Sequence, residues 1–424
     1  MRQERNNIFL GVDWVMVLLY LMLVGFGWFN IRAASLSEEN TELINFSTKY
    51  GKQLIWIILS VPIIILILFI NSKFYERFSS IFYLISILSL VGLFIFGKEI
   101  KGAKSWYNFG GMSLQPSEFA KALTALALAK LISDRKYNLS LIKNQIKAFI
   151  IIFLPALLIA VHDAGSALIY LSFFFVLNRE GLTPVYIVLG VTSILLFIFT
   201  IYFGVSPVFI SLFGIITLYT LYRIYFNKRF LRFNWFKVVA TYLICGLFIF
   251  GVDYTYNNLL LKHQKDRFEV LLGKTSDTKN IGYNSNQSIQ TISSGGFSGK
   301  GYLKGDRTQG KFVPEQHTDY IFSTVGEEWG FVGSASVIIV FIILLFRIIN
   351  RAEKHTNKFG RIYGYGVASI LFFHLVVNVG MVIGLLPTVG IPLPFISYGG
   401  SSLWGFTLLL FIFIKLDAQK SYDW

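Results

Sequence analysis

Apolar runs of about 20 residues follow one another along almost the whole chain, and each is long enough to cross roughly 30 Å of hydrocarbon as a helix. The runs are solidly apolar and do not alternate with polar residues, which argues against a membrane β-barrel. The pattern therefore predicts an all-α polytopic integral membrane protein with ten to twelve transmembrane helices. The predicted spans lie near residues 9–31, 53–70, 78–97, 116–133, 147–162, 165–178, 183–203, 205–222, 236–252, 330–346, 363–384 and 401–415.

The polar segments between these spans carry unequal charge. Lysine and arginine are concentrated in every second loop, for example 223–232 and 347–361, whereas the loop at 32–52 contains three glutamates. Because lysine and arginine favour cytoplasmic loops, this alternation predicts that both termini are cytoplasmic. The same rule explains most of the +15 net charge. Membrane lipids are therefore expected partners, and nucleic acid is not.

This topology divides the chain into three parts. Residues 1–252 form an N-terminal bundle, 253–318 form a large extracytoplasmic loop, and 319–424 return to the membrane. Loops this long are usually functional or disordered, and the aromatic residues of 253–318 favour an ordered, functional loop. The prolines and glycines of residues 385–400 predict a re-entrant loop, since irregular backbone at membrane depth has to be buried in protein or line a cavity.

Two clusters of charged residues lie beside or inside the N-terminal spans. Glu118 and Lys121 are three residues apart on one helix face, where they pair as a tolerated ion pair or line a functional cavity. Lys104 and Trp106 lie in an outer loop and suit either an interfacial anchor or a site for an anionic, membrane-borne substrate. The sequence alone leaves both choices open.

The stretch "VPEQHTDYIF", Val313–Phe322, places an acid where a span meets the outer surface. Thr318 suits a helix N-cap, which would put Asp319 in the first helical turn and favour its ionised form. That carboxylate could serve as a general base or only as a helix-capping charge. For His317 the sequence leaves three roles open: a second base, a group that orients the substrate, or an interfacial residue. Glu327 and Glu328 are expected either to pair with Lys121 or to lie at the interface.

The glycine-rich stretch "SGGFSGKG" does not fit the Walker pattern, because its glycine, lysine and serine residues are spaced differently. Its amides and Lys300 could contact phosphate oxygens, but a solvated flexible loop is the simpler interpretation. No metal-ligand spacing or catalytic triad stands out. His162 and His374 are expected to be satisfied core residues.

Eight sequence motifs occur in order over most of the chain. They are "KGAKSWYNFGGMSLQPSEFAK", "HDAGSAL", "NREGL", "HQKDRF", "GYNSNQS", "PEQHTDYIF", "GEEWG" and "NVGMVIGLLPTVGIPLPFISYGGSS". Together they closely resemble the SEDS family (shape, elongation, division and sporulation) of bacteria. "NVGMVIGLLP" and "GIPLPF" are more similar to its RodA-type elongation members than to its FtsW-type division members. The family has ten spans, so the resemblance implies that a helix pair near residues 205–252 is inserted.

The resemblance implies a peptidoglycan glycosyltransferase of the bacterial cytoplasmic membrane. Such an enzyme polymerises lipid II on the extracytoplasmic face and works with a class B penicillin-binding protein. It implies that Asp319 is the essential acid and that Trp106, Glu118 and Lys121 match functional positions. The full set of substrate-binding candidates is Lys104, Trp106, Glu118, Lys121, His263, Gln264, Arg267, Lys300, Gln316, His317 and Thr318.

In the mechanism that follows, Asp319 accepts the proton of the attacking sugar hydroxyl, and a cation stabilises the departing diphosphate. Lys104, Lys121, Arg267 or a divalent cation, Mg²⁺ or Mn²⁺, could supply that charge, and no cofactor is certain. The alternatives are a transporter that flips lipid II, a division-type glycosyltransferase, and a scaffold without chemistry. Of these, only a glycosyltransferase specifically requires the outer acid.

Overall fold

The computed structural model describes residues 11–36, 45–100, 103–110, 112–226, 235–259, 265, 269, 272 and 282–419. The chain forms two compact units. The first comprises Met1–Thr183 and Tyr283–Trp424, and the second comprises Pro184–Gly282. The predicted domain boundaries at 252 and 318 differ from this division, because residues 283–318 pack with the first unit and helices from residue 185 onward belong to the second.

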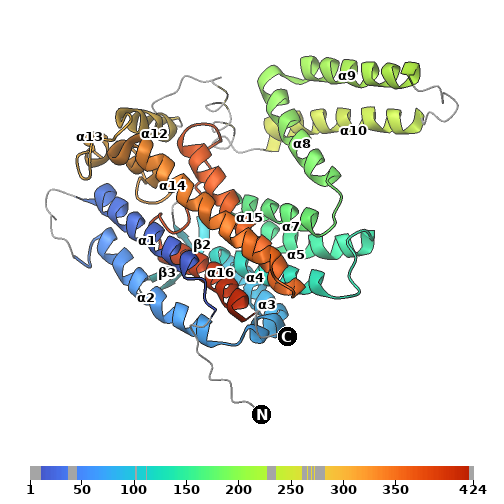
Figure 1. Cartoon of the computed structure of the whole chain (residues 1–424). Coiled ribbons are helices and arrows are strands. Elements are labelled where there is room, and N and C mark those ends of the chain that lie inside the picture. Colours follow the sequence, from blue (N-terminus) through green and yellow to red (C-terminus); the bar gives the residue numbers. More distant parts are fainter. Residues whose placement is uncertain are drawn as a thin grey trace, which may run out of the picture. The chain divides into compact units, whose positions relative to one another are not determined.

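The first unit holds most of the helices (Figure 1). They are α1 (Trp14–Ser35), α2 (Lys49–Phe69), α3 (Ser72–Phe96), α4 (Pro116–Ser133), α5 (Ile142–Ala160), α6 (Ala164–Leu168), η1 (Ile169–Ser172), α7 (Phe173–Arg179), α12 (Tyr283–Ser294), α13 (Asp306–Gln309), α14 (Ile321–Glu353), α15 (Lys358–Val382) and α16 (Gly400–Gln419). The second unit holds α8 (Val185–Phe203), α9 (Val205–Phe226) and α10 (Trp235–Tyr254), which continues as a π-helical turn, Thr255–Leu259.

Every predicted span coincides with a helical segment. Within the described residues, ten helices are long and apolar enough to cross a membrane, which confirms a multi-pass helical membrane protein. The two remaining segments are α4, which carries Glu118, Lys121 and Lys130, and the shorter apolar segment Ala164–Arg179. Helices α15 and α16 are the most buried of the ten and form the centre of the first unit with α4 and α14.

A small antiparallel sheet, absent from the sequence-based prediction, covers part of the first unit. Its strands are β1 (Lys98–Ile100), β2 (Ala103–Phe109) and β3 (Met112–Leu114), in the order β1-β2-β3. Its last strand is tied to the start of α16, because Ser401 Oγ donates to the Ser113 carbonyl oxygen and accepts from the Gln115 amide.

Helix α14 is broken at Gly330, where φ is 63° and ψ is −160°. Such a backbone conformation is essentially restricted to glycine. The glycine-rich stretch 295–301 bonds to the backbone on both sides of the break: Lys300 N and Gly301 N donate to the carbonyl oxygens of residues 327 and 328, and the amides of residues 331 and 332 donate to those of 296 and 297. These bonds satisfy backbone groups that a break in a membrane helix would otherwise leave unpaired.

Candidate active site around Asp319

Asp319 lies in a turn immediately before α14, and three other parts of the chain hold that turn. The His317 carbonyl oxygen accepts from Tyr398 N at 2.9 Å, and the Thr318 carbonyl oxygen accepts from Ser397 Oγ at 2.7 Å. The Asp319 carbonyl oxygen accepts from Asn378 Nδ2 at 2.8 Å. Three consecutive peptide groups are therefore fixed from outside, while the Asp319 side chain remains partly exposed.

The predicted N-cap at Thr318 is wrong. Helix α14 begins at Ile321, its cap position is Tyr320, and no side chain caps it. The Thr318 hydroxyl lies 3.1 Å from the Glu315 carbonyl oxygen and 3.2 Å from Glu315 Oε2, so it bonds backwards along the chain. Asp319 consequently belongs to the preceding turn and not to the first turn of the helix.

The segment between α15 and α16, residues 383–399, forms the wall opposite Asp319. It is non-helical and buried over most of 391–397, as the prolines and glycines of this stretch predict. A Cβ placed at Gly390 would lie 3.3 Å from Asp319 Oδ2, so the carboxylate reaches this wall directly. The wall also touches α1, because a Cβ at Gly27 would lie 2.6 Å from the Ile396 Cα.

The predicted Glu118–Lys121 pair is present and buried, with 2.9 Å between Lys121 Nζ and Glu118 Oε2. Lys121 Nζ also lies 3.0 Å from His374 Nε2, and His374 Nδ1 lies 3.1 Å from the Pro392 carbonyl oxygen. A carbonyl can only accept, so Nδ1 carries the proton and Nε2 accepts from the ammonium. The alternative pairing of Lys121 with Glu327 or Glu328 is wrong.

His374 and Asn378 are the residues that the sequence analysis missed as parts of this site. His374 is a buried and bonded histidine, as expected, but its partner is Lys121. Asn378 is fully buried and joins the Asp319 carbonyl oxygen to that of Ile391. The available signal was the spacing of four residues, which places both polar side chains on one face of an apolar helix.

Glu327 organises the glycine-rich loop beside the site. Its carboxylate accepts from Ser294 Oγ, Lys300 Nζ, Arg307 N, and both the amide and the hydroxyl of Thr308. Lys300 also donates to Asp306, and its bonds, chiefly that to Glu327, raise the pKa of Lys300 above its ordinary 10.5. Lys300 therefore holds the loop together in this structure, which accounts for two of its three donor hydrogens.

Several other substrate-binding candidates also bond within the protein. Lys104 Nζ donates to the Phe94 carbonyl oxygen at the end of α3. Gln316 is buried and donates to the carbonyl oxygens of Ala34 and Thr308. His317 is buried, with its ring 5.6 Å from that of Tyr398. Trp106 is partly exposed on β2, opposite Lys98.

Some of the candidates cannot be placed. His263, Gln264 and Arg267 lie outside the described residues. In the part of the chain that is described, no three His, Cys, Asp or Glu side chains gather closely enough to hold a metal ion. The divalent cation considered for the diphosphate therefore has no assigned protein ligands among these residues.

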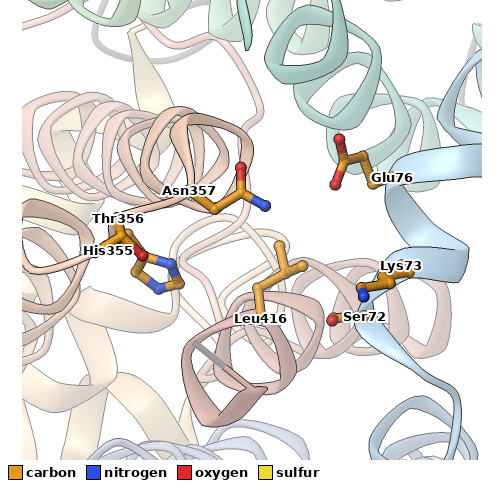
Figure 2. Close-up of a pocket in the computed structure, with 8 residues that line it drawn as sticks. Ser72, Lys73, Glu76, His355, Thr356, Asn357 and Leu416 are labelled. Carbon is orange, nitrogen blue, oxygen red and sulfur yellow. The ribbon is translucent and has the colours of Figure 1, made fainter. Parts of the chain in front are cut away.

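Among the described residues of the first unit, two of the better-formed cavities lie away from Asp319, which lines neither. One, of about 350 Å³, has a mixed polar and apolar lining and lies at the other end of α14, between the start of α3 and the start of α15 (Figure 2). Lys73, Glu76, His355 and Asn357 contribute to its lining. The other, of about 440 Å³, is apolar and lies between α1 and α14, where Phe26 and Trp329 contribute to its wall.

The fold and the site together define a polytopic helical membrane protein with a carboxylate-bearing turn fixed against a buried irregular loop. The family model described as "Cell cycle protein", for FtsW, RodA and SpoVE, matches residues 13–234 and 230–422. The chain belongs to this family, and the predicted membership in the SEDS family is thereby confirmed.

Named relatives agree with this assignment, and a solved structure shares the fold. The chain is 30% identical to the peptidoglycan glycosyltransferase RodA of Treponema pallidum, over 96% of this chain and 98% of that protein. It is 34% identical to the peptidoglycan glycosyltransferase MrdB of Escherichia coli K12, over 79% and 76%. A chain solved in a peptidoglycan synthase complex has the same fold, with a TM-score of 0.70, 24% identity, and 98% and 100% of the two chains covered.

Proposed function

We propose that this protein is a peptidoglycan glycosyltransferase that extends glycan strands from lipid II during cell elongation, with Asp319 as its general base. The single observation that carries the proposal is the setting of Asp319. The turn that carries Asp319 is fixed by three separate donors, one to each carbonyl of residues 317–319, while the Asp319 side chain is partly exposed beside the loop wall. A fixed but accessible carboxylate is what proton transfer from a bound hydroxyl requires.

The reaction needs no other source of energy, because the leaving group is a lipid-linked diphosphate. Asp319 accepts the proton of the acceptor sugar hydroxyl as that oxygen bonds to the anomeric carbon of the donor. The bond from that carbon to the diphosphate breaks, and the diphosphate leaves with its electron pair. One-step displacement inverts the configuration at the anomeric carbon.

Charge for the departing diphosphate has to come from groups near the reacting carbon. Lys121 is buried and already binds Glu118 and His374, so its role in the proposal is to support the site from within. Lys104 lies on β2, and its ammonium donates to the Phe94 carbonyl oxygen at the end of α3. Arg267, which lies outside the described residues, remains the proposed source of charge, and a divalent cation would supply positive charge if one were bound with the substrate.

The proposal also fixes the sidedness of the molecule. The positive loops favour cytoplasmic termini, which would put the Asp319 turn on the extracytoplasmic face, where lipid II would be polymerised. A class B penicillin-binding protein is the proposed partner, since a polymerised strand has to be cross-linked. The similar chain solved in a peptidoglycan synthase complex supports this proposal.

The test is a polymerisation assay on purified protein with its transpeptidase partner and labelled lipid II. Asp319→Asn is expected to lose nearly all glycan synthesis, because the amide cannot accept the proton. Asp306→Asn is the matched control. It makes the same change of charge at a side chain that is 85% exposed. Full activity of Asp319→Asn would remove Asp319 as the base.

The same preparation distinguishes the transporter reading. A lipid II flippase would move labelled lipid across vesicles without making glycan, and Asp319→Asn would leave that movement intact. Glycan made by the wild type, without lipid translocation, supports the proposed enzyme. A protein that does neither, but restores activity to its partner, is a scaffold.

A further inference from the structure

Asn378 bonds both to the turn that carries Asp319 and to the loop segment that contains Ile391. Its side-chain nitrogen donates to the Asp319 carbonyl oxygen at 2.8 Å and to the Ile391 carbonyl oxygen at 2.7 Å. A side-chain amide has two N–H groups, so both donors are committed. The residue is fully buried in α15, where packing allows its side chain little freedom.

These two bonds set the spacing between the Asp319 carboxylate and its wall. Ile391 follows Gly390, the residue against which Asp319 Oδ2 lies. One amide therefore fixes the turn that carries the carboxylate and the segment that faces it. Loss of Asn378 would release both at once, while leaving the carboxylate itself chemically unchanged.

One helical turn earlier on α15, His374 holds the next carbonyl of the same segment. It lies 3.1 Å from the Pro392 carbonyl oxygen on one side and 3.0 Å from Lys121 Nζ on the other. Two adjacent loop carbonyls, those of Ile391 and Pro392, are thus held by two residues on one face of α15. The buried Glu118–Lys121 pair is connected through them to the Asp319 turn.

We propose that Asn378 is a positioning residue for Asp319, and that His374 joins the Glu118–Lys121 pair to the same wall. The proposal rests on the proposed function, in which Asp319 is the base. A base displaced by about 1 Å from its productive position costs roughly 100-fold in rate. Since neither residue is placed in contact with substrate, the loss is expected in kcat, with little change in KM.

The test compares Asn378→Ala with Asn378→Asp over a range of pH. Alanine removes both donors, so kcat falls about 100-fold at every pH. Ionised aspartate can only accept and faces two carbonyl oxygens, but protonated aspartate can donate one bond. Asn378→Asp is therefore expected to regain part of its activity, relative to wild type at the same pH, as the pH is lowered. Ser369→Ala in the same helix is the control.

A second measurement does not depend on activity. Hydrogen–deuterium exchange of the peptide 313–322 is expected to be faster in Asn378→Ala than in wild type, and unchanged in Ser369→Ala. Unchanged exchange, or wild-type kcat in Asn378→Ala, overturns the positioning role and leaves Asp319 as the base. If exchange is faster in Asn378→Ala but Asp319→Asn is fully active, Asn378 still fixes the turn, and Asp319 is rejected as the base.

The role of His374 is tested by a pair of substitutions. His374→Phe keeps a ring next to Phe406 but offers nothing to Lys121 or to the Pro392 carbonyl. His374→Gln retains one acceptor and one donor. The glutamine variant is expected to keep a higher kcat than the phenylalanine variant at equal thermal stability. Equal kcat values for the two variants would reject the connection through His374.

Discussion

Glu118 and Lys121 show how a single buried residue can be costly to change. Both side chains are almost fully buried, at 2% exposure for Glu118 and 3% for Lys121. Burying two charges is unfavourable, and their attraction offsets this only while both are present. The pair is therefore expected to behave as a unit in stability measurements, whatever it contributes to activity.

Lys121→Met is expected to destabilise the protein by about 3–5 kcal/mol, because it leaves the Glu118 carboxylate buried without its cation. The double variant Glu118→Gln/Lys121→Met is expected to recover most of that loss. Thermal unfolding in detergent measures both. A double variant as unstable as the single one would show that the attraction within the pair is not what the single substitution removes.

The residue scale also shows where sequence reasoning ends. Glu118 and Lys121 could be paired from the sequence, because their spacing of three fixes their relation on a helix. His374 is 253 positions from Lys121, and nothing in a single sequence indicates that two such distant residues meet. The N-cap assigned to Thr318 failed because α14 begins at Ile321, two residues later than a cap at Thr318 requires, and the Thr318 hydroxyl donates to the Glu315 carbonyl oxygen instead.

At the scale of elements, the broken helix α14 is the least regular feature of the first unit. Its break lies at Gly330, and the glycine-rich stretch 295–301 supplies the missing backbone partners. In Figure 1, α12 and α13 gather at the start of this helix, next to the break. The loop that the sequence left as solvated is therefore part of the helix structure.

Gly330→Ala tests the break. A Cβ at this position would lie 2.3 Å from Gly299 N, and the backbone conformation itself costs a non-glycine residue about 1–3 kcal/mol. A marked fall in thermal stability is expected. Gly25→Ala in α1 is the matched control, because a Cβ there meets nothing within 4 Å. Equal stability of the two variants would contradict the structure at Gly330.

Glu327→Ala is expected to destabilise the glycine-rich loop by about 3 kcal/mol, because it removes the buried carboxylate that accepts five hydrogen bonds and leaves those donors unpaired. Proteolysis within residues 295–308 measures the effect. Since the pKa of Lys300 is raised, the wild-type contribution is complete below the ordinary pKa of 10.5 and is lost as the pH rises through the raised value. Equal loop protection in Glu327→Ala and wild type at one pH below 10 would contradict the role of the pair.

Elements were predictable where composition alone decides them. The apolar runs gave all the spans, and the prolines and glycines of residues 385–400 indicated irregular backbone. The apolar span in α14 was predicted to begin near residue 330, whereas the helix begins at Ile321, because "STVGEEWG" is too polar to be counted in an apolar run. The three short strands escaped notice because hairpins of this size have little sequence signal.

At the scale of the whole molecule, sidedness is the prediction that all the chemistry depends on. The chain has a single cysteine, Cys245, so a cysteine-free background needs one substitution. In that background Lys304→Cys is expected to react with a membrane-impermeant maleimide in intact cells stripped of their outer layers. Lys354→Cys is expected to react only after permeabilisation. Both positions are exposed, which makes them a matched pair.

Reaction of Lys354→Cys alone in intact cells would reverse the topology. Asp319 would then face the cytoplasm, and polymerisation outside the membrane could not use it. The family assignment would stand, because it depends on matched residues and not on orientation.

The wall segment 383–399 has a consequence for resistance to inhibitors of this protein. It meets the Asp319 turn, α1 at Gly27 and α15 largely through backbone atoms. A compound that bound these peptide groups would offer few side chains whose replacement could confer resistance. Escape substitutions that bent the segment would also displace the carboxylate, so we expect resistant strains selected against such a compound to grow with impaired cell walls.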